Sequence, residues 1–423
     1  MKHVTTCLFL LANAAAAARP QQDPPHVTLE PPHLAVGVDA RQTTELVMTF
    51  DQPMDQSTHA LCGGGLSFPK VIEVTWRDAR TCVAQVSLLP DSVYAMDLSC
   101  AGSSGFRSRD GVRLPHTPWR IATRGQAFTE GQAASATARL FRVIDDHYSY
   151  RDRLGIDWNE LERTHHDLLT TAPDGPAFAL RCAAMLAAAQ DLHVGVRWND
   201  CTLPTWQREI QPNFDLRGLQ KAMPKLTRVG RIGLTARTDD GIGYLLVSSF
   251  AREQRDDFER VLTTLRDLRD CKALVLDVRN NGGGDELLAK RLAAFFVDGD
   301  KVYAAHRVRD PQAAEGFRAV EERRLRGNAE PDVFGGEVAV LMGPANMSSC
   351  EAFLLMMKQA KNATLLGDNS YGSSGNPLPQ VITANLTVML PSWQAMLPDG
   401  TVFEGAGIAP HIHVEAKPEQ LVD

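Results

Sequence analysis

Short runs of alternating apolar and polar residues fill the first part of the chain, over residues 27–124. Runs such as TELVMTF, VIEVTW and CVAQVSL are separated by Gly, Pro, Asp and Ser at the spacing of a β-sandwich. This pattern predicts a β-sandwich domain over residues 25–125. From Phe128 to about Ala189 the apolar residues recur three and four positions apart, which predicts a helical subdomain over residues 126–200.

From residue 201 onward, apolar strand patterns alternate with amphipathic helix patterns. The strand patterns are GYLLVSSF, KALVLDV and EVAVLMG, and the helix patterns are EQRDDFERVLTTLRDLRD, DELLAKRLAAFFV and SSCEAFLLMMKQAKN. Two buried apolar strands, each followed by a tight turn and a helix, predict a parallel α/β core over residues 201–423. In such sheets ligands bind beyond the carboxyl ends of the strands, and both turns fall there.

Composition and charge narrow the class of protein. The chain has 423 residues, of which 44% are hydrophobic and 22% charged, as in ordinary globular proteins with more than one domain. Its net charge of −7 and the lack of a basic block argue against nucleic-acid binding. A basic start at Lys2, an apolar run and an alanine tract before Arg19 predict a signal peptide over residues 1–18. We therefore expect an exported protein, periplasmic or extracellular, with no integral membrane segment after signal removal.

The cysteines fit export. Signal removal takes Cys7 and leaves seven: Cys62, Cys82, Cys100, Cys182, Cys201, Cys271 and Cys350. We expect disulfides among the first three and between Cys182 and Cys201, because an exported protein folds under oxidising conditions. The odd count leaves an unpaired thiol, for which Cys350 is the candidate. Without a C-x-x-C pair we expect no metal, and the motifs call for no cofactor.

The stretch PANMSSCEAF, at the start of the last helix pattern, has two possible meanings. Ser348 and Glu351 match a capping box, in which the side chains of an N-cap serine and a glutamate three positions on bond each other's backbone N–H groups. A serine at such a turn also lies beside free N–H groups that can hold an oxyanion. Taken alone, the stretch leaves a helix cap and a nucleophile both open.

Three further segments bear on that choice. The turn RNNGGG follows a buried strand, and its third glycine indicates a backbone amide presented to a ligand. His193 opens the run HVGVRW, with Asp191 two residues earlier. Glu404 precedes two closely spaced glycines in EGAGIAP. Taken singly, a structural histidine and a surface glutamate are the simpler interpretations.

In this order, the segments DLH, RNNGGG, MSSCEAF and EGAGIAP resemble the tail-specific, or C-terminal processing, protease superfamily, which includes the tricorn core protease and the modules of interphotoreceptor retinoid-binding protein. The resemblance runs from about Phe128 to the C-terminus. The phrases FDQPMD, LLPDSVYAMDL and FRSRDGVRL in the β region resemble bacterial Ig-like modules. The fold class implied is an Ig-like β-sandwich, a helical segment and a crotonase/ClpP-like α/β core.

The resemblance also implies roles for individual residues. The family's nucleophile lies three residues before the helix glutamate, which selects Ser348 as nucleophile. The N–H of Ser349 and that of Gly282 or Gly283 would form the oxyanion hole. Ser373, in the turn YGSSG, stands where the Ser–Lys members of the superfamily carry their lysine.

No lysine occurs between Lys361 and Lys417, which favours the Ser–His design. His193 would then act as general base and Glu404 would help to orient and polarise the site. The serine that usually precedes this histidine is replaced by Leu192, so Asp191 or Glu404 would have to substitute for it.

The interval from Trp198 to Leu276 is too short for its own strand and helix together with a PDZ domain, so none is expected. The sequence thus predicts an exported serine peptidase acting on a peptide or protein substrate. Two alternatives are a weakly active or inactive binding protein for an apolar ligand or peptide on the same fold, and a scaffold in which the Ig-like module docks partners.

Overall fold

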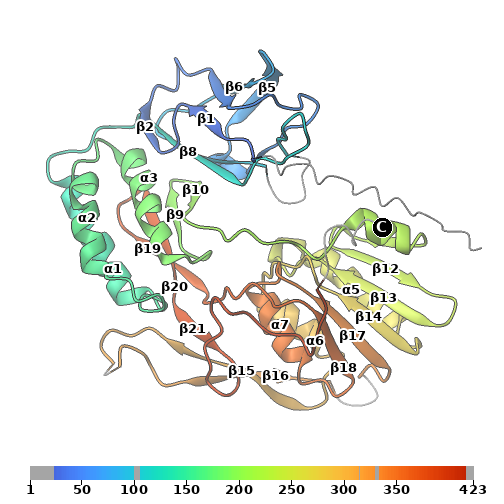
Figure 1. The fold of residues 1–423 in the computed structure, drawn as a ribbon. Helices are drawn as coiled ribbons and strands as arrows, with labels where there is room; N and C mark the ends of the chain where they lie inside the picture. The colour runs from blue at the N-terminus through green and yellow to red at the C-terminus, as the bar shows by residue number, and fades with distance from the viewer. Residues whose placement is uncertain (1–22, 100–104, 314, 329–332, 416–423) are drawn as a thin grey trace, which may run out of the picture.

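The computed structural model describes residues 23–99, 105–313, 315–328 and 333–415. The predicted signal peptide, Cys7 and Cys100 lie outside the described residues. Figure 1 shows a β domain above a helical layer, with a large α/β sheet beside that layer. Within the described segments, no helix is both long and apolar enough to cross a bilayer.

The N-terminal region is built from two four-stranded sheets, with strand orders β1-β3-β6-β5 and β2-β8-β7-β4. Their strands are β1 (Val27–Glu30), β2 (Ala35–Val38), β3 (Glu45–Phe50), β4 (Leu61–Cys62), β5 (Lys70–Trp76), β6 (Thr81–Ser87), β7 (Val93–Leu98) and β8 (Thr117–Thr123), with a 3-10 turn η1 (Gly65–Ser67). Met48 and Phe50 of one sheet share a core with Trp119 and Ile121 of the other. The predicted strands are confirmed and form a two-sheet sandwich; its Ig-like nature stays a prediction.

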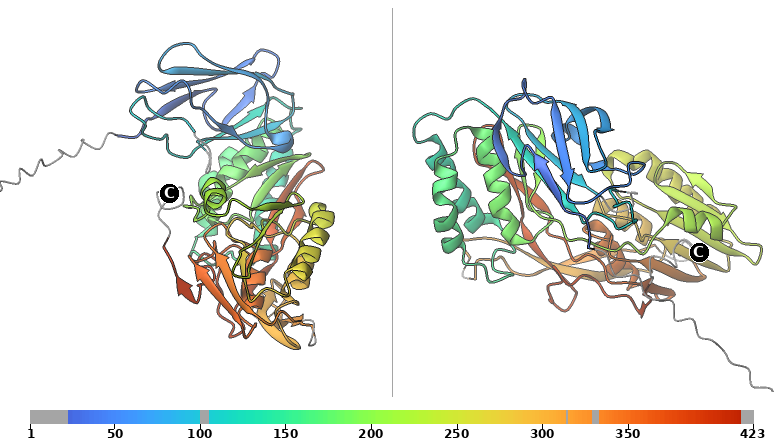
Figure 2. Two further views of the ribbon diagram at one scale, coloured as in Figure 1. Left: turned by 90° about the vertical axis from the view of Figure 1, so that its right-hand side faces the viewer. Right: turned by 45° about the horizontal axis from the view of Figure 1, so that its top comes forward.

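The helical layer follows the sandwich and shares a core with a third sheet. Its helices are α1 (Gln132–His147), α2 (Trp158–Thr170) and α3 (Gly175–Leu186), followed by the 3-10 turn η2 (Ala187–Ala189). The sheet has the order β10-β9-β20-β19, with β9 (Gly195–Trp198), β10 (Cys201–Pro204), β19 (Pro377–Val381) and β20 (Leu386–Pro391). Half of this sheet therefore comes from the C-terminal part of the chain. The views of Figure 2 show the sandwich resting on this layer.

The α/β core contains a seven-stranded sheet of order β11-β12-β13-β14-β17-β18-β22, parallel from β13 onward. Its strands are β11 (Thr227–Val229), β12 (Gly233–Arg237), β13 (Ile242–Val247), β14 (Ala273–Asp277), β17 (Glu337–Met342), β18 (Ala363–Gly367) and β22 (Ile412–His413). Its helices are α4 (Leu216–Ala222), α5 (Arg255–Asp267), preceded by η3 (Arg252–Gln254), α6 (Glu286–Ala293) and α7 (Ser349–Met357). The three strand and three helix patterns expected from residue 201 onward are confirmed.

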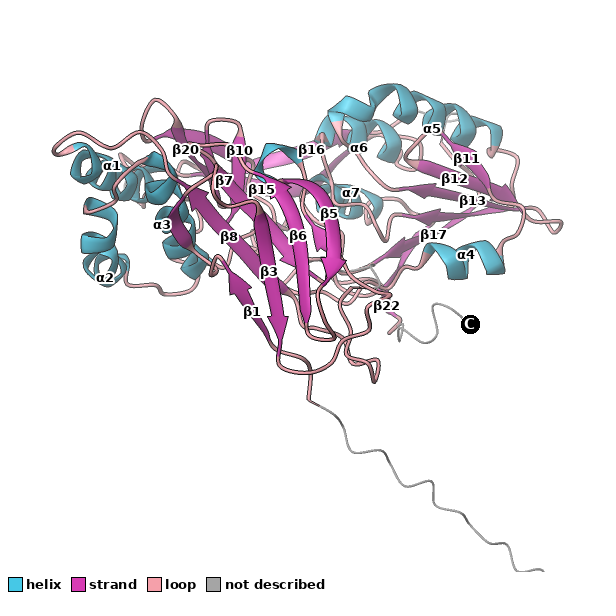
Figure 3. Cartoon of the chain, turned by 90° about the horizontal axis from the view of Figure 1, so that it is seen from above, coloured by secondary structure: helices cyan, strands magenta, loops and turns pink. Residues whose placement is uncertain are grey.

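The two faces of this sheet are covered differently, as alternation along a strand requires. Leu245 and Val247 of β13 pack with the helices α5, α6 and α7, whereas Tyr244 and Leu246 pack with residues around α4. Figure 3 shows α5 and α6 on one side of the sheet and α4 on the other. Every residue of α7 is buried, which fits a helix whose residues are apolar apart from Ser349 and Glu351.

A three-stranded sheet of order β16-β15-β21 completes the core: β15 (Asp300–Val308), β16 (Glu321–Arg326) and β21 (Trp393–Met396). Between β10 and β13, where we expected no PDZ domain, the chain forms an extended segment, α4, β11 and β12. The last two are strands of the main sheet.

The expected disulfide between Cys182 and Cys201 is wrong, because both thiols are free and buried. Cys182 of α3 and Cys201 of β10 both belong to the apolar core that the helical layer shares with its sheet, so packing accounts for both. Cys62 is disulfide-bonded. Cys82 and Cys350 are also free.

Candidate active site

Two strand-to-helix turns meet at the carboxyl edge of the seven-stranded sheet. Asp277, the last residue of β14, lies opposite Leu246 of β13 and Leu341 of β17. Because these parallel strands end at one level, the glycine turn after β14 and the serine turn after β17 lie next to each other. This is the edge where the sequence predicts a ligand site.

The first turn residue of interest, Ser348, does not cap its helix. It is the N-cap of α7 with φ 55° and ψ −125°, and its side chain makes no capping hydrogen bond. A serine with positive φ is strained, and such strain is held only where the surroundings enforce it. Here the Ser348 N–H donates to Ser373 O at 2.7 Å. The capping-box interpretation therefore fails at the serine, whose hydroxyl has no hydrogen-bond partner among the described residues.

The Glu351 side chain keeps the capping-box interaction with the Ser348 backbone and makes further hydrogen bonds beyond it. Its carboxylate is fully buried and accepts hydrogen bonds from the Ser370 hydroxyl at 2.6 Å, the Gly372 N–H at 2.7 Å and the Ser373 N–H at 3.1 Å. Burial raises the pKa of Glu351 to about 7, and these hydrogen bonds oppose that rise. Glu351 thus fixes the YGSSG loop beneath the start of α7.

The glycine turn approaches the serine turn so closely that a side chain would not fit. Gly283 has φ 98°, and a Cβ there would lie 2.7 Å from Met347 O and 2.9 Å from Ser349 N. The Ser349 hydroxyl donates to Gly284 O at 2.6 Å, which ties the two turns together. Gly283 therefore permits backbone contact between the turns, whereas Gly284 permits close approach to Phe250.

The backbone N–H groups around Ser348 differ in availability. The Gly283 N–H donates to Asn281 Oδ1 at 2.8 Å and is already satisfied, against its predicted role in an oxyanion hole. Within the described chain, the N–H groups of Ser349, Gly282 and Gly284 have no hydrogen-bond partner. Ser349 is the first residue of α7, where an N–H has no partner inside the helix.

Buried Asn346 holds the two turns in register. Its side-chain amide donates to Val278 O and to Asn281 O, and its Oδ1 accepts from the Gly343 N–H at 2.8 Å. It therefore links the end of β17 to the end of β14 through three hydrogen bonds.

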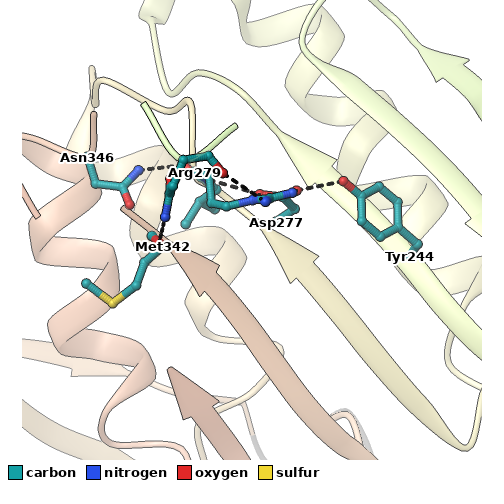
Figure 4. Close-up of polar contacts among 7 residues, drawn as sticks. Tyr244, Asp277, Arg279, Met342 and Asn346 are labelled. Atoms are coloured by element: carbon teal, nitrogen blue, oxygen red, sulfur yellow. Dashed lines mark hydrogen bonds and ion pairs between the residues drawn. The ribbon is translucent and has the colours of Figure 1, made fainter. Parts of the chain in front are cut away.

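Behind these bonds lies a buried charge network, drawn in Figure 4. The Arg279 guanidinium binds Asp277 Oδ2 at 2.7 Å, and the Tyr244 hydroxyl donates to the same oxygen at 2.7 Å. Asp277 is fully buried, so these partners are needed to compensate its charge. The motif arginine of RNNGGG thus supports the glycine turn from the sheet side.

His193 reaches this edge from the loop before β9. Its Nδ1 lies 2.8 Å from Ser373 Oγ, and its backbone N–H donates to Asp191 Oδ1 at 2.9 Å. Burial lowers the pKa of the imidazole below its usual 6.5, and the Asp191 carboxylate partly opposes this. The ring is therefore neutral near pH 7 and, with a donor proton on Nδ1, would offer Nε2 as an acceptor.

The sequence identified Ser373 only as the residue at the position where Ser–Lys members of the superfamily carry their lysine. Its contact with His193 was not predicted. Its backbone carbonyl accepts from the Ser348 N–H, and its own N–H donates to Glu351. One buried residue thus connects the serine turn, the helix glutamate and the histidine ring. Ser373 supplies the hydroxyl that Leu192 lacks.

Glu404 lies near these groups with a different partner from the one expected. Its Oε2 accepts from the Ser374 N–H at 2.8 Å, and no hydrogen bond to the His193 ring is found within the described residues. Burial and the neighbouring Asp191 carboxylate raise the pKa of Glu404 well above its usual range. Asp191 in turn accepts from the Tyr148 hydroxyl at 2.9 Å. Glu404 therefore supports the YGSSG loop, one residue beyond Ser373.

Ser348 and His193 line one cavity of about 500 Å³. The other lining residues are Arg252, Gly284, Asp285, Glu286, Arg323, Ser349, Ser374, Asn376, Pro377 and Trp393. No hydrogen bond joins the Ser348 hydroxyl to His193 in the part of the chain that is described. Catalytic hydrogen bonds of ligand-free sites are often long and shorten when substrate binds.

Comparisons with known proteins concern this part of the chain. Residues 241–414 match the model of Peptidase family S41. The carboxy-terminal processing protease CtpB of Bacillus subtilis (strain 168) is 25% identical over 176 residues, which are 41% of this chain and 34% of CtpB. A protein of Staphylococcus haemolyticus (strain JCSC1435) named as a CtpA-like serine protease is 22% identical over 49% of this chain and 40% of its own length. The chain therefore spans well under half of these relatives.

Solved structures support the fold. A Parabacteroides merdae protein superposes with a TM-score of 0.60 at 20% identity, over 68% of this chain and 91% of that protein. A CPAF mutant superposes with a TM-score of 0.51 at 12% identity, over 69% of this chain and 94% of its own. Together, the family match, the curated relatives and the fold support the assignment of residues 241–414 to Peptidase family S41, the family of the C-terminal processing proteases.

Proposed function

We propose that this protein is a serine-type peptidase that hydrolyses peptide bonds of a peptide or protein substrate. The observation that carries the proposal is the arrangement of Ser348, His193 and Ser373. The Ser348 hydroxyl, which caps no helix and lies in a strained turn, shares a cavity with the neutral imidazole of His193. Nδ1 of that imidazole contacts the buried hydroxyl of Ser373. A helix cap or a scaffold requires none of these features.

In the proposed reaction, Ser348 Oγ attacks the peptide carbonyl carbon while His193 Nε2 takes the hydroxyl proton. The same proton then passes to the leaving amine as the C–N bond breaks, which leaves an acyl ester on Ser348. Water, deprotonated by His193, hydrolyses this ester and restores the serine. Ser373 keeps the proton of His193 on Nδ1, so that Nε2 is the basic nitrogen.

The oxyanion of each tetrahedral intermediate would be held by backbone N–H groups. The Ser349 N–H is the first donor, because it is unpaired at the positive end of α7. Of the two glycines expected to supply the second donor, Gly282 is the one whose N–H is unpaired among the described residues. Gly284, which lines the cavity, is a further candidate. Glu404 acts indirectly, by fixing Ser374 beside the Ser373 hydroxyl.

The experiment that tests the proposal is covalent labelling with a serine-directed fluorophosphonate. Wild-type protein should be labelled once, at Ser348, and Ser348→Ala should not be labelled. His193→Ala should slow labelling strongly, because the hydroxyl loses its base. Equal labelling of wild type and Ser348→Ala would refute the assignment.

The binding of an apolar ligand, one form of the binding-protein alternative, is disfavoured by the charged lining of the cavity. The largely buried charged side chains of Asp285, Glu286 and Arg323 line it, and an apolar ligand would remove their remaining contact with water. Export also remains part of the proposal. It is supported by the disulfide-bonded Cys62, since disulfides persist mainly outside the reducing cytosol.

A further inference from the structure

The cavity of Ser348 contains one buried cation that the proposed chemistry does not use. Arg323 belongs to β16, and its side chain is only 9% exposed although it lines the cavity. Its Cζ lies 5.0 Å from the centre of the Trp393 ring and 5.6 Å from that of Tyr303. Two aromatic rings therefore hold the guanidinium in place, which reduces the entropy lost when a ligand binds.

The charge of Arg323 is only partly compensated. Among the described residues, the guanidinium forms a single ion pair, with Glu286. That carboxylate also accepts from the Tyr303 hydroxyl and lies 3.6 Å from Lys290 Nζ. Two cations thus share one carboxylate, which leaves an excess of one positive charge.

The other charged pair of the cavity does not alter this balance. Arg252 and Asp285 form their own ion pair at 3.1 Å and cancel each other. Burial lowers the pKa of Arg323 to about 10, so the group is still charged at neutral pH. A buried charge with free N–H donors is stabilised when an anion reaches them, and the planar guanidinium fork suits a carboxylate best.

We propose that Arg323 recognises a carboxylate of the substrate, so that the cavity selects peptides with a carboxylate close to the bond that is cut. An acidic side chain and a free C-terminus offer the same chemistry, and matched peptide pairs separate them. The inference rests on the proposed function only where it states that a bond near the carboxylate is cleaved. Carboxylate binding by Arg323 can be measured without catalysis.

The test uses the full-length Ser348→Ala protein and fluorescent peptides, with affinity measured by anisotropy at fixed salt. One peptide pair carries Glu or Gln within the sequence, and a second pair ends in a free carboxylate or an amide. At least one acidic peptide should bind about tenfold or more tightly than its neutral partner. The pair that shows the difference identifies the source of the carboxylate, and equal binding in both pairs would overturn the proposal.

Two further variants, made in the Ser348→Ala protein, assign the preference to Arg323. Arg323→Gln should abolish it, and Glu286→Gln should enlarge it because the guanidinium loses its competing carboxylate. Arg237→Gln, which removes an exposed arginine paired with Asp270, is the control for general charge and should leave the ratio unchanged.

A preference that survives Arg323→Gln would contradict the assignment to this residue. If that variant does not fold, Glu286→Gln decides, since an unchanged or smaller preference would also contradict it. Cleavage by wild type without any acidic preference would overturn this inference and keep the proposed function. A preference for acidic peptides without cleavage or labelling would overturn the proposed function and keep this inference.

Discussion

Two neighbouring turns of the main sheet perform the same connection in different ways. The turn after β14 leads into α6 through Asp285, whose φ is −87° and whose side chain accepts from the Leu287 N–H. The turn after β17 leads into α7 through Ser348, whose φ is 55° and whose side chain caps nothing. Both follow a parallel strand and lie at one edge of the sheet.

The difference indicates which turn stabilises its helix and which one presents a reactive group. A side chain that caps a helix stabilises it but has its acceptor occupied. Around Ser348 the stabilising contacts come from other residues, namely Glu351, Asn346 and Ser373, and the serine hydroxyl stays available. Local strain at Ser348 is maintained by this surrounding framework.

The largest expected effect follows from removing the Ser348 hydroxyl. Ser348→Ala should lower kcat/KM for peptide hydrolysis by about 10⁴-fold or more, since it removes the proposed nucleophile. The free energy of unfolding should stay close to that of wild type, because the hydroxyl makes no hydrogen bond in the described structure. Peptide hydrolysis and urea unfolding measure both values. A large loss of stability would show that Ser348 is a structural residue.

A smaller effect is expected from Ser373. Ser373→Ala should lower kcat by about 10²- to 10³-fold with little change in KM, because His193 loses the partner that fixes its tautomer. In wild type kcat/KM should rise as His193 deprotonates, with a midpoint below pH 6.5, and the midpoint should move in the variant. Ser374→Ala is the matched control and should cost far less. Equal losses of kcat in Ser373→Ala and Ser374→Ala would show that Ser373 does not orient His193.

Next in size is the pH dependence of stability due to Glu351. Its pKa rises from 4.5 to about 7 on folding, so the folded state binds the proton more tightly than the unfolded chain. This contribution is fully present below pH 4.5 and is lost as pH rises through about 7. The contribution corresponds to about 3 kcal/mol of the free energy of unfolding. Glu351→Gln should remove most of this pH dependence. Urea unfolding at several pH values between 4.5 and 8 tests this, and parallel curves for both proteins would rule it out.

The smallest effect is expected at the other turn. Asp285→Ala removes the α6 cap and should destabilise the protein by about 1 kcal/mol. Its effect on kcat should be minor next to that of Ser348→Ala, although Asp285 also pairs with Arg252 at the cavity. A kinetic loss as large as that of Ser348→Ala would erase the distinction between the turns.

The sequence itself determined the elements of the core and the position of the serine turn. Alternating apolar strands and amphipathic helices are local patterns, and β13, β14, β17, α5, α6 and α7 follow from them. The glycine turn was also visible, because three consecutive glycines after a buried strand indicate close approach of another backbone or a ligand. The order of the four motifs then pointed to the S41 family, which the match over residues 241–414 supports.

Contacts between distant residues were decided only by the tertiary structure. Ser373 lies 180 residues from His193 along the chain, and no local pattern shows that their side chains meet. The Cys182–Cys201 pairing failed for the same reason, since spacing alone does not bring two thiols together. Whether Ser348 caps α7 depends on Ser373 and Gly283, which lie next to its backbone and come from two other segments. Sequence patterns report local conformation and burial, whereas the orientation of a reactive group is set by the packing of separate segments.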